Sequence, residues 1–229
     1  MKARFAAIAD VHGNRPALEA VLEDIERRGI GTVVNLGDHL FGPLDRDGTA
    51  AILRERDFPS VSGNQDRELV DQGDPHGSWL ARMPLTLELE GALLFHGTPT
   101  KDNVYLLETI HANGVVLASN EEIADRLGNI AQSLLLCGHT HIPRVVRFGT
   151  QLIVNPGSVG LQAYEDDSPH PHRMETGSQQ ARYAVLEQHG AGWNVELIAV
   201  PYDCEAAAQM ALRNNRPDWA HRLRTGRAR

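Results

Sequence analysis

The chain has 229 residues, of which 41% are hydrophobic and 23% charged. Such proportions are typical of soluble globular proteins and exclude a mostly disordered or fibrous chain. No apolar run approaches the roughly 18 residues that a membrane helix needs, so we expect no membrane contact. The two cysteines, Cys137 and Cys204, lie in no metal-ligand pattern and predict no disulfide framework, and we expect a cytoplasmic protein.

The formal net charge is −8, and it is spread unevenly along the chain. Residues 201–229 contain six arginines and three acidic residues, so the first 200 residues carry a larger negative charge than the whole chain. An acidic body argues against general nucleic-acid affinity, and we expect nucleic acid only as a nucleotide or dinucleotide substrate. We expect one domain over residues 1–200. Residues 201–229 should form an arginine-rich helical extension, packed on or trailing that domain. Its arginines could bind anionic partners, but we expect them on a solvated helix face.

The first 36 residues predict a strand–helix–strand unit. Residues 4–9 form an apolar run typical of a buried strand, and Asn14 can cap a following helix with Pro16 in its first turn. Residues 32–36 predict the next strand, joined to the first by a right-handed parallel crossover. This places Asp10 and Asp38 together at the carboxyl ends of adjacent strands, where ligands bind in open α/β sheets.

The rest of the chain predicts an α/β protein with many short elements. The apolar pattern indicates strands at residues 59–62, 85–89, 92–95, 134–137, 145–148, 151–154, 182–186 and 194–200. Helices are predicted at residues 50–56, 103–131 and 205–212. Residues 163–181 are polar and contain Pro169, Pro171 and Gly177, and we expect a long loop there.

Five predicted strands end in small groups of residues that can ligate metals. Each group alone has an ordinary structural explanation, such as a turn or a hydrogen-bonded core histidine. Together they place seven nitrogen and oxygen donors at one edge of the sheets, which favours more than one divalent ion of Mn, Fe, Zn or Ni over a calcium site. The candidate ligands are Asp10, His12, Asp38, Asn64, His96, His139 and His141.

The ordered motifs D-x-H, G-D, G-N-x-[DE], H-G and G-H-x-H resemble those of the calcineurin-like binuclear metallophosphoesterases, over residues 4 to about 200. Residues 155–158, Asn-Pro-Gly-Ser, resemble the small bacterial and archaeal branch. The resemblance implies a four-layer αββα sandwich of two mixed β-sheets with the metals at its loop-rich edge. It also implies hydrolysis of phosphate esters or anhydrides, in which a hydroxide bridging the two metals attacks phosphorus.

The resemblance also assigns ligands to each of the two metals. One metal takes Asp10, His12, Asp38 and His141. The other takes Asp38, Asn64, His96 and His139, so that Asp38 bridges the pair.

One position departs from the family pattern. Relatives often carry after Gly-Asn a histidine that contacts the phosphate and protonates the leaving group, but this chain has Gln65. Glutamine can hydrogen-bond a phosphate oxygen but cannot donate a proton as an acid. His39 is a candidate substitute acid or a surface histidine without a role, and Asn14 is a weak candidate for substrate contact. Weaker candidates for the substrate side are Tyr105, Arg144, Tyr164, His170 and His172.

The sequence therefore predicts a metal-dependent phosphoesterase that acts on a small phosphorylated substrate and favours good leaving groups. It leaves open a phosphomonoesterase, a phosphodiesterase, a protein phosphatase and a dinucleoside polyphosphate hydrolase. Two alternatives come from other classes: a non-catalytic metal-binding scaffold of the same fold, and a metallohydrolase that does not act on phosphorus. The intact set of seven ligands argues against the scaffold, because a scaffold has no need of costly buried polar groups.

Overall fold

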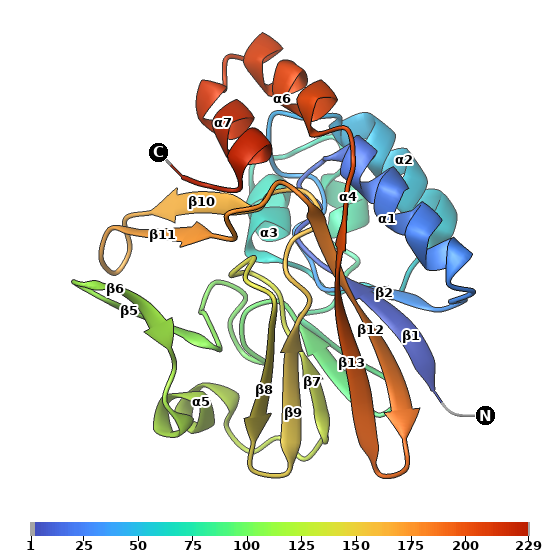
Figure 1. Cartoon of the computed structure of the whole chain (residues 1–229), viewed down its shortest axis with the longest axis vertical. Coiled ribbons are helices and arrows are strands. Elements are labelled where there is room, and N and C mark those ends of the chain that lie inside the picture. Colours follow the sequence, from blue (N-terminus) through green and yellow to red (C-terminus); the bar gives the residue numbers. More distant parts are fainter. Residues whose placement is uncertain (1–2, 229) are drawn as a thin grey trace.

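The computed structural model describes residues 3–228, which form two β-sheets packed face to face (Figure 1). Both sheets are mixed, because each contains parallel and antiparallel neighbours. The first sheet has the order β13 (Gly192–Val200), β12 (Ala181–His189), β1 (Arg4–Ile8), β2 (Val33–Asn35). The second has the order β3 (Thr86–Leu89), β4 (Ala92–Phe95), β7 (Leu134–Leu136), β9 (Gln151–Asn155), β8 (Arg144–Phe148).

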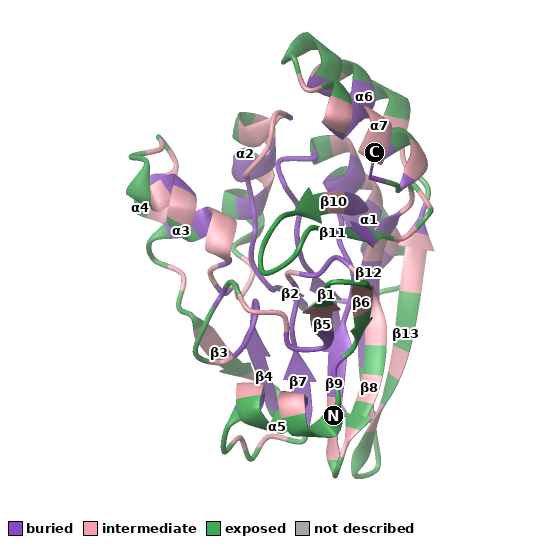
Figure 2. Ribbon diagram, turned by 90° about the vertical axis from the view of Figure 1, so that its left-hand side faces the viewer, coloured by how far each residue is buried: buried purple, intermediate pink, exposed green. Residues whose placement is uncertain are grey.

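The alternation of side chains along the strands builds four layers. In β1, Phe5 and Ala7 pack between the two sheets, whereas Ala6 and Ile8 pack with the apolar face of α1 (Arg15–Arg27). In β4, Leu94 belongs to the core between the sheets, and Leu93 packs with α5 (Asn120–Leu127) on the outer face. The central strands β4 and β7 of the second sheet are accordingly buried along their whole length (Figure 2). The predicted α/β fold with a four-layer αββα arrangement is confirmed.

The predicted strand–helix–strand unit is also present. The Asn14 side chain accepts the backbone N–H of Ala17 and caps α1, and β1 and β2 pair in parallel. After β2 the chain forms α2 (Arg46–Arg56), α3 (Asn64–Asp71) and α4 (Gly77–Leu80). At the other end of the chain, α6 (Cys204–Arg213) and α7 (Pro217–Thr225) pack together above β10 (Ala163–Asp166) and β11 (His172–Glu175) in Figure 1.

Three predicted elements are wrong. Residues 103–131 contain the hairpin of β5 (Glu108–His111) and β6 (Gly114–Leu117), and only α5 is helical there. Residues 163–181 are not a structureless loop, because β10 and β11 pair in an antiparallel hairpin whose exposed strands stand out in Figure 2. Residues 59–62 make a single isolated bridge, from Ser60 to Asn35, instead of a strand. Within residues 3–228, no helix has both the length and the apolar character needed to cross a membrane.

Candidate metal centre

The candidate metal ligands meet at the carboxyl ends of the parallel strands. Asp10 follows β1, Asp38 follows β2, His96 follows β4, and His139 and His141 follow β7. The side chains of Asp10, Asp38 and His96 are almost completely buried, although all of them are polar. Burying several ionisable groups in one place is costly unless they pair or bind a cation. The placement therefore indicates a functional site at this edge of the two sheets.

The backbone is strained at most of these residues. Five of the candidate ligands have a positive φ, which costs a residue with a side chain about 1 kcal/mol or more. Gly37, next to Asp38, has a φ of +101°, and a side chain there would collide with Gly63 and His96. Such strain persists only where the surrounding structure enforces it, and it is typical of functional sites. The positive-φ ligands are Asp10 (55°), His12 (51°), Asp38 (57°), His139 (70°) and His141 (60°).

Three of the histidines are oriented by backbone carbonyl groups. Each Nδ1 lies within hydrogen-bond distance of one carbonyl oxygen, so that the neutral ring carries its proton on Nδ1 and directs the lone pair of Nε2 into the cluster. Orientation of this kind is usual for histidines that bind metals. The three contacts are His12 to Phe41 at 3.0 Å, His96 to Leu36 at 2.7 Å, and His141 to Leu161 at 2.6 Å.

The inward-facing nitrogen and carboxylate oxygen atoms of the cluster lie close together. The Nε2 atoms of His12 and His141 are 3.1 Å apart, and Asp10 Oδ1 lies 3.2 Å from His141 Nε2. His96 Nε2 lies 3.4 Å from Asp38 Oδ2. Among the described residues, Asp10 Oδ1 is buried without a hydrogen-bond partner. Lone pairs that face each other at these distances repel unless a cation or a proton lies between them, so the donor set fits a metal.

The candidate ligands form two overlapping groups of three. One group is Asp10, His12 and His141, the other is Asp10, Asp38 and His96, and in each group the ligand atoms all lie within 4.8 Å of one another. Asp10 belongs to both groups, whereas the family resemblance assigns the bridging role to Asp38 alone. Asp38 Oδ2 is nevertheless 4.0 Å from His12 Nε2, so both carboxylates lie between the groups.

Asn64 and His139 lie beside the second group. Asn64 Oδ1 is 3.1 Å from His96 Nε2, and the His139 ring centroid is 5.1 Å from that of His96. The backbone N–H of His139 also donates to Asp10 Oδ2 at 3.2 Å. The structure thus brings all seven predicted metal ligands into one cluster.

Charge within the cluster keeps most of these groups in the protonation state that binds metal. Burial opposes ionisation of Asp10 and Asp38, but the neighbouring histidines lower the pKa of both carboxyl groups. Burial and the charge on His96 lower the pKa of His139 to about 4. Burial also opposes the charged form of His96, but the carboxylates of Asp38 and Asp10 raise its pKa to about 10. His96 therefore has to release a proton before it can bind a metal.

Gln65 lies at the amino-terminal end of α3 and lines the cavity next to the cluster. Its backbone N–H donates to Asp38 Oδ1 at 2.9 Å, and this bond connects the start of α3 to the candidate metal ligand Asp38. Its side-chain Oε1 is buried without a hydrogen-bond partner in the described part of the chain.

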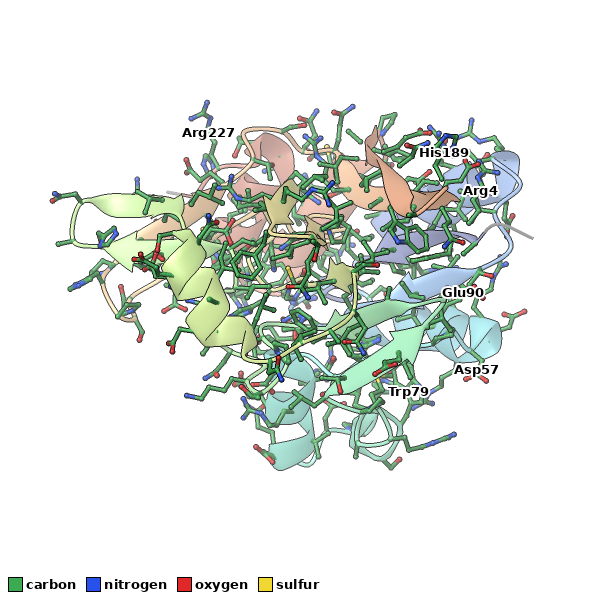
Figure 3. All side chains as sticks on the ribbon, turned by 90° about the horizontal axis from the view of Figure 1, so that it is seen from below. Arg4, Asp57, Trp79, Glu90, His189 and Arg227 are labelled. Carbon is green, nitrogen blue, oxygen red and sulfur yellow. The ribbon has the colours of Figure 1, made fainter. Side chains whose placement is uncertain are left out.

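His39 is not the surface histidine considered from the sequence. It is completely buried, its Nδ1 lies 2.8 Å from Asp66 Oδ2, and its ring packs edge-to-face on Trp79 of α4, which Figure 3 labels. His39 is not among the residues that line the cavity beside the cluster. Asn14 does not line the cavity either, because it caps α1 and its Nδ2 donates to Gly160.

Asp66, the last residue of the G-N-x-[DE] motif, was not among the candidate site residues predicted from the sequence. Its carboxylate accepts the backbone N–H groups of Asp38, His39 and Gly63, each at 2.9 Å. These bonds hold the loop after β2 against the start of α3. Asp66 thus fixes the positions of Asp38 and Asn64 without pointing into the cluster itself.

A cavity of about 200 Å³ lies next to the cluster, and some of the residues that line it were not predicted from the sequence. Tyr105 and Tyr164, weak candidates from the sequence, line it and are hydrogen-bonded to each other at 2.8 Å. Trp219 and Arg222 of α7, and Arg216 just before it, also line the cavity. The arginines were expected on a solvated helix face, which is wrong for Arg222, whose side chain is 12% exposed. Of the other weak candidates, His172 contacts Tyr105, Arg144 pairs with Glu108, and His170 is exposed.

The fold and this cluster agree with a comparison of the chain with known protein families. The model of the calcineurin-like phosphoesterase superfamily domain matches residues 3–187. The chain therefore belongs to the calcineurin-like phosphoesterase superfamily, and it is a hydrolytic enzyme.

Three relatives show how far this likeness extends. An uncharacterised protein of Methanocaldococcus jannaschii is 25% identical over 256 residues, which cover 99% of this chain and 100% of the relative. Phosphodiesterase YfcE of Escherichia coli is 33% identical over 172 residues, which cover 70% of this chain and 80% of the relative. The crystal structure of a metallophosphoesterase from Sphaerobacter thermophilus has the same fold, with a TM-score of 0.75, 23% identity and coverage of 97% and 98% of the two chains.

Proposed function

We propose that the protein is a metal-dependent phosphoesterase whose centre holds two divalent ions. The observation that carries this proposal is the convergence of imidazole Nε2 lone pairs and carboxylate oxygens, with Asp10 Oδ1 left without a partner in the described residues. The residues that would hold the ions are Asp10, His12, Asp38, Asn64, His96, His139 and His141. Mixed imidazole, carboxylate and amide donors favour Mn, Fe, Zn or Ni.

Two such ions supply Lewis acidity and a water of lowered pKa for attack on phosphorus. The protein's own groups then bind and orient the substrate. The Gln65 side-chain amide faces the cavity and can donate to a phosphoryl oxygen. Because Gln65 cannot donate a proton as an acid and His39 is buried elsewhere, the enzyme should favour leaving groups that depart without protonation.

The cavity of about 200 Å³ favours a small phosphorylated substrate over a folded protein substrate. The identity of 33% to phosphodiesterase YfcE supports the inclusion of phosphodiesters among the substrates to be tested. Aryl monoesters, aryl diesters and phosphoanhydrides, which all have good leaving groups, should be hydrolysed faster than alkyl esters.

The test is turnover of p-nitrophenyl phosphate and bis-p-nitrophenyl phosphate by chelator-treated protein, with and without added Mn²⁺, Fe²⁺, Zn²⁺ or Ni²⁺. We expect hydrolysis only after metal addition, and loss of that activity in Asp10→Asn. Equal turnover in excess chelator, or none with any of the four metals, would contradict the proposal.

The leaving-group preference is tested separately. We expect kcat/KM of the wild type to fall steeply as the leaving-group pKa rises, and Gln65→His to flatten that dependence, since general acid catalysis is worth about 10²–10⁴ in rate. Gln72→His, at the other end of α3 and exposed, is the matched control. If kcat/KM of the wild type depends only weakly on the leaving-group pKa, and Gln65→His does not change that dependence, the absence of a histidine at position 65 does not deprive the enzyme of a general acid.

A further inference from the structure

The helix α7 lies outside residues 3–187, which match the family domain, yet it forms one wall of the candidate active site. It is fixed there by apolar packing, because Trp219 and Leu223 are buried in a cluster with Leu44 and Leu161. The Trp219 ring also packs edge-to-face on the candidate ligand His12, with ring centroids 5.9 Å apart. Figure 1 shows α7 directly above the β10–β11 hairpin, whose residue Glu165 lines the same cavity. The position of α7 next to the cluster is therefore well defined.

Arg222 of α7 is a nearly buried guanidinium with poor partners. Its side chain is 12% exposed, and its Nε is buried with no hydrogen-bond partner among residues 3–228. Its two ion pairs are long, at 3.5 Å to Glu165 and 3.6 Å to Asp218. By contrast, the more exposed Arg224 of the same helix holds Glu205 at 2.6 Å. Arg222 thus lines the cavity with a guanidinium whose hydrogen-bonding capacity is only partly used.

The carboxylates near Arg222 have other cations of their own. Glu165 pairs with Arg173 at 3.1 Å, and Asp218 pairs with Arg216 at 2.7 Å. Both acids therefore stay neutralised if Arg222 turns to a ligand. The remaining carboxylate of this wall, Asp166, accepts the backbone N–H of Ser168. The cavity can in this way admit an anion at Arg222 without leaving an unpaired buried acid.

We propose that Arg222 binds a second phosphoryl group, directly linked to the one at the metal cluster, so that the substrate class is phosphoanhydrides. This inference rests on the proposed function. The planar guanidinium matches two phosphate oxygens, and Arg222 lines the same small cavity as the candidate ligands Asp38 and His141. Hydrolysis adds one water across the P–O–P bridge, breaks one bridging P–O bond and releases two phosphate products.

The experiment compares inorganic pyrophosphate with p-nitrophenyl phosphate, since both release orthophosphate and only the first has a second phosphoryl group. In Arg222→Gln we expect the ratio of kcat/KM for pyrophosphate to kcat/KM for p-nitrophenyl phosphate to fall about 10- to 100-fold. In Arg222→Lys, which keeps the positive charge but not the planar guanidinium, this ratio should fall less. The control Arg227→Gln removes an exposed arginine at the outer edge of the molecule (Figure 3) and should leave the ratio unchanged.

Glu165→Gln separates substrate binding from a merely structural ion pair. If Glu165 competes with the substrate for Arg222, this variant should raise the ratio above that of the wild type. If the pair only attaches α7 to β10, the variant should lower Tm without raising the ratio, and this result would overturn the proposal. Because Glu165→Gln leaves Arg222 in place, comparing it with the wild type also tests the proposal if Arg222→Gln does not fold.

Calorimetric titration with imidodiphosphate and with orthophosphate, at the same free Mn²⁺ concentration, gives a readout that needs no turnover. We expect wild-type protein to bind imidodiphosphate more tightly, and Arg222→Gln to lose about 10- to 100-fold of that affinity. Wild-type protein that hydrolyses neither compound contradicts the proposed function, and the titration then still decides the subsite. Equal affinities for the two anions, or an equal loss in Arg227→Gln, would overturn the subsite itself.

Discussion

Asp66→Asn should disable the metal centre although Asp66 points away from it. The carboxylate accepts three backbone N–H groups at 2.9 Å and lies 2.8 Å from His39 Nδ1. An amide in its place turns one NH₂ group toward these donors, which removes one charge-assisted hydrogen bond and leaves buried donors facing each other. The expected loss of stability is about 2–3 kcal/mol. For a chain of this length, that corresponds to a fall in Tm of about 4–12 °C.

The assay is thermal unfolding of the metal-free protein, followed by metal content after dialysis against excess Mn²⁺. We expect Asp66→Asn to lower both Tm and metal content, because the loops that carry Asp38 and Asn64 lose their common anchor. Asp71→Asn, in the same helix but facing solvent, is the matched control and should change neither. If the two variants show the same Tm and the same metal content, the anchoring role of Asp66 is refuted.

Three further predictions concern the centre and the layers beneath it. Trp219→Leu should weaken metal binding about tenfold, because the His12 ring loses the contact that holds it in place. The control Trp193→Leu removes a similar edge contact, to Phe5, and should leave metal affinity unchanged. Equal metal affinities of the two variants would refute this role of Trp219. Mn²⁺ at 100 times its dissociation constant should stabilise the protein by about 2.7 kcal/mol, seen as a rise in Tm that is absent in Asp10→Asn; a rise in both proteins would count against the site. Asp24→Asn should lower Tm at pH 7. Burial opposes ionisation of Asp24, but Tyr183 and Arg28 hold the pKa of Asp24 below its ordinary value of about 4. The contribution of the Asp24 carboxylate to the free energy of unfolding is therefore present above that pH and is lost in acid. The difference in Tm between wild type and Asp24→Asn should therefore shrink as the pH falls below about 4, and a constant difference would contradict the assignment.

The sequence predicted that the candidate metal ligands lie together because most of them follow buried parallel strands. Where a strand is apolar and its end is marked by Gly-Asp or Gly-His, the strand direction alone brings the polar residues to one edge. The same argument failed for the hairpins β5–β6 and β10–β11. Their strands are only four residues long and none is buried throughout, so the hydrophobic pattern is too short to indicate a strand, and pairing with each other decides their structure.

The wall formed by α7 could not be read from the sequence for a related reason. Trp219, Ala220 and Leu223 do form an apolar face, but nothing in that pattern says against which loop the face packs. Only the tertiary contact with Leu44 and Leu161 turns Arg222 into the cavity. The buried position of His39 was missed likewise, since its partner Asp66 lies 27 residues further along the chain.

Anomalous diffraction from crystals soaked in Mn²⁺, recorded at the manganese edge, tests the central claim most directly. The account predicts two peaks per chain, one among Asp10, His12 and His141 and the other among Asp10, Asp38 and His96. It also predicts that Asp38→Asn weakens the second peak more than His141→Ala does. A single peak, or two peaks elsewhere in the molecule, would contradict the assignment of this cluster as a binuclear centre.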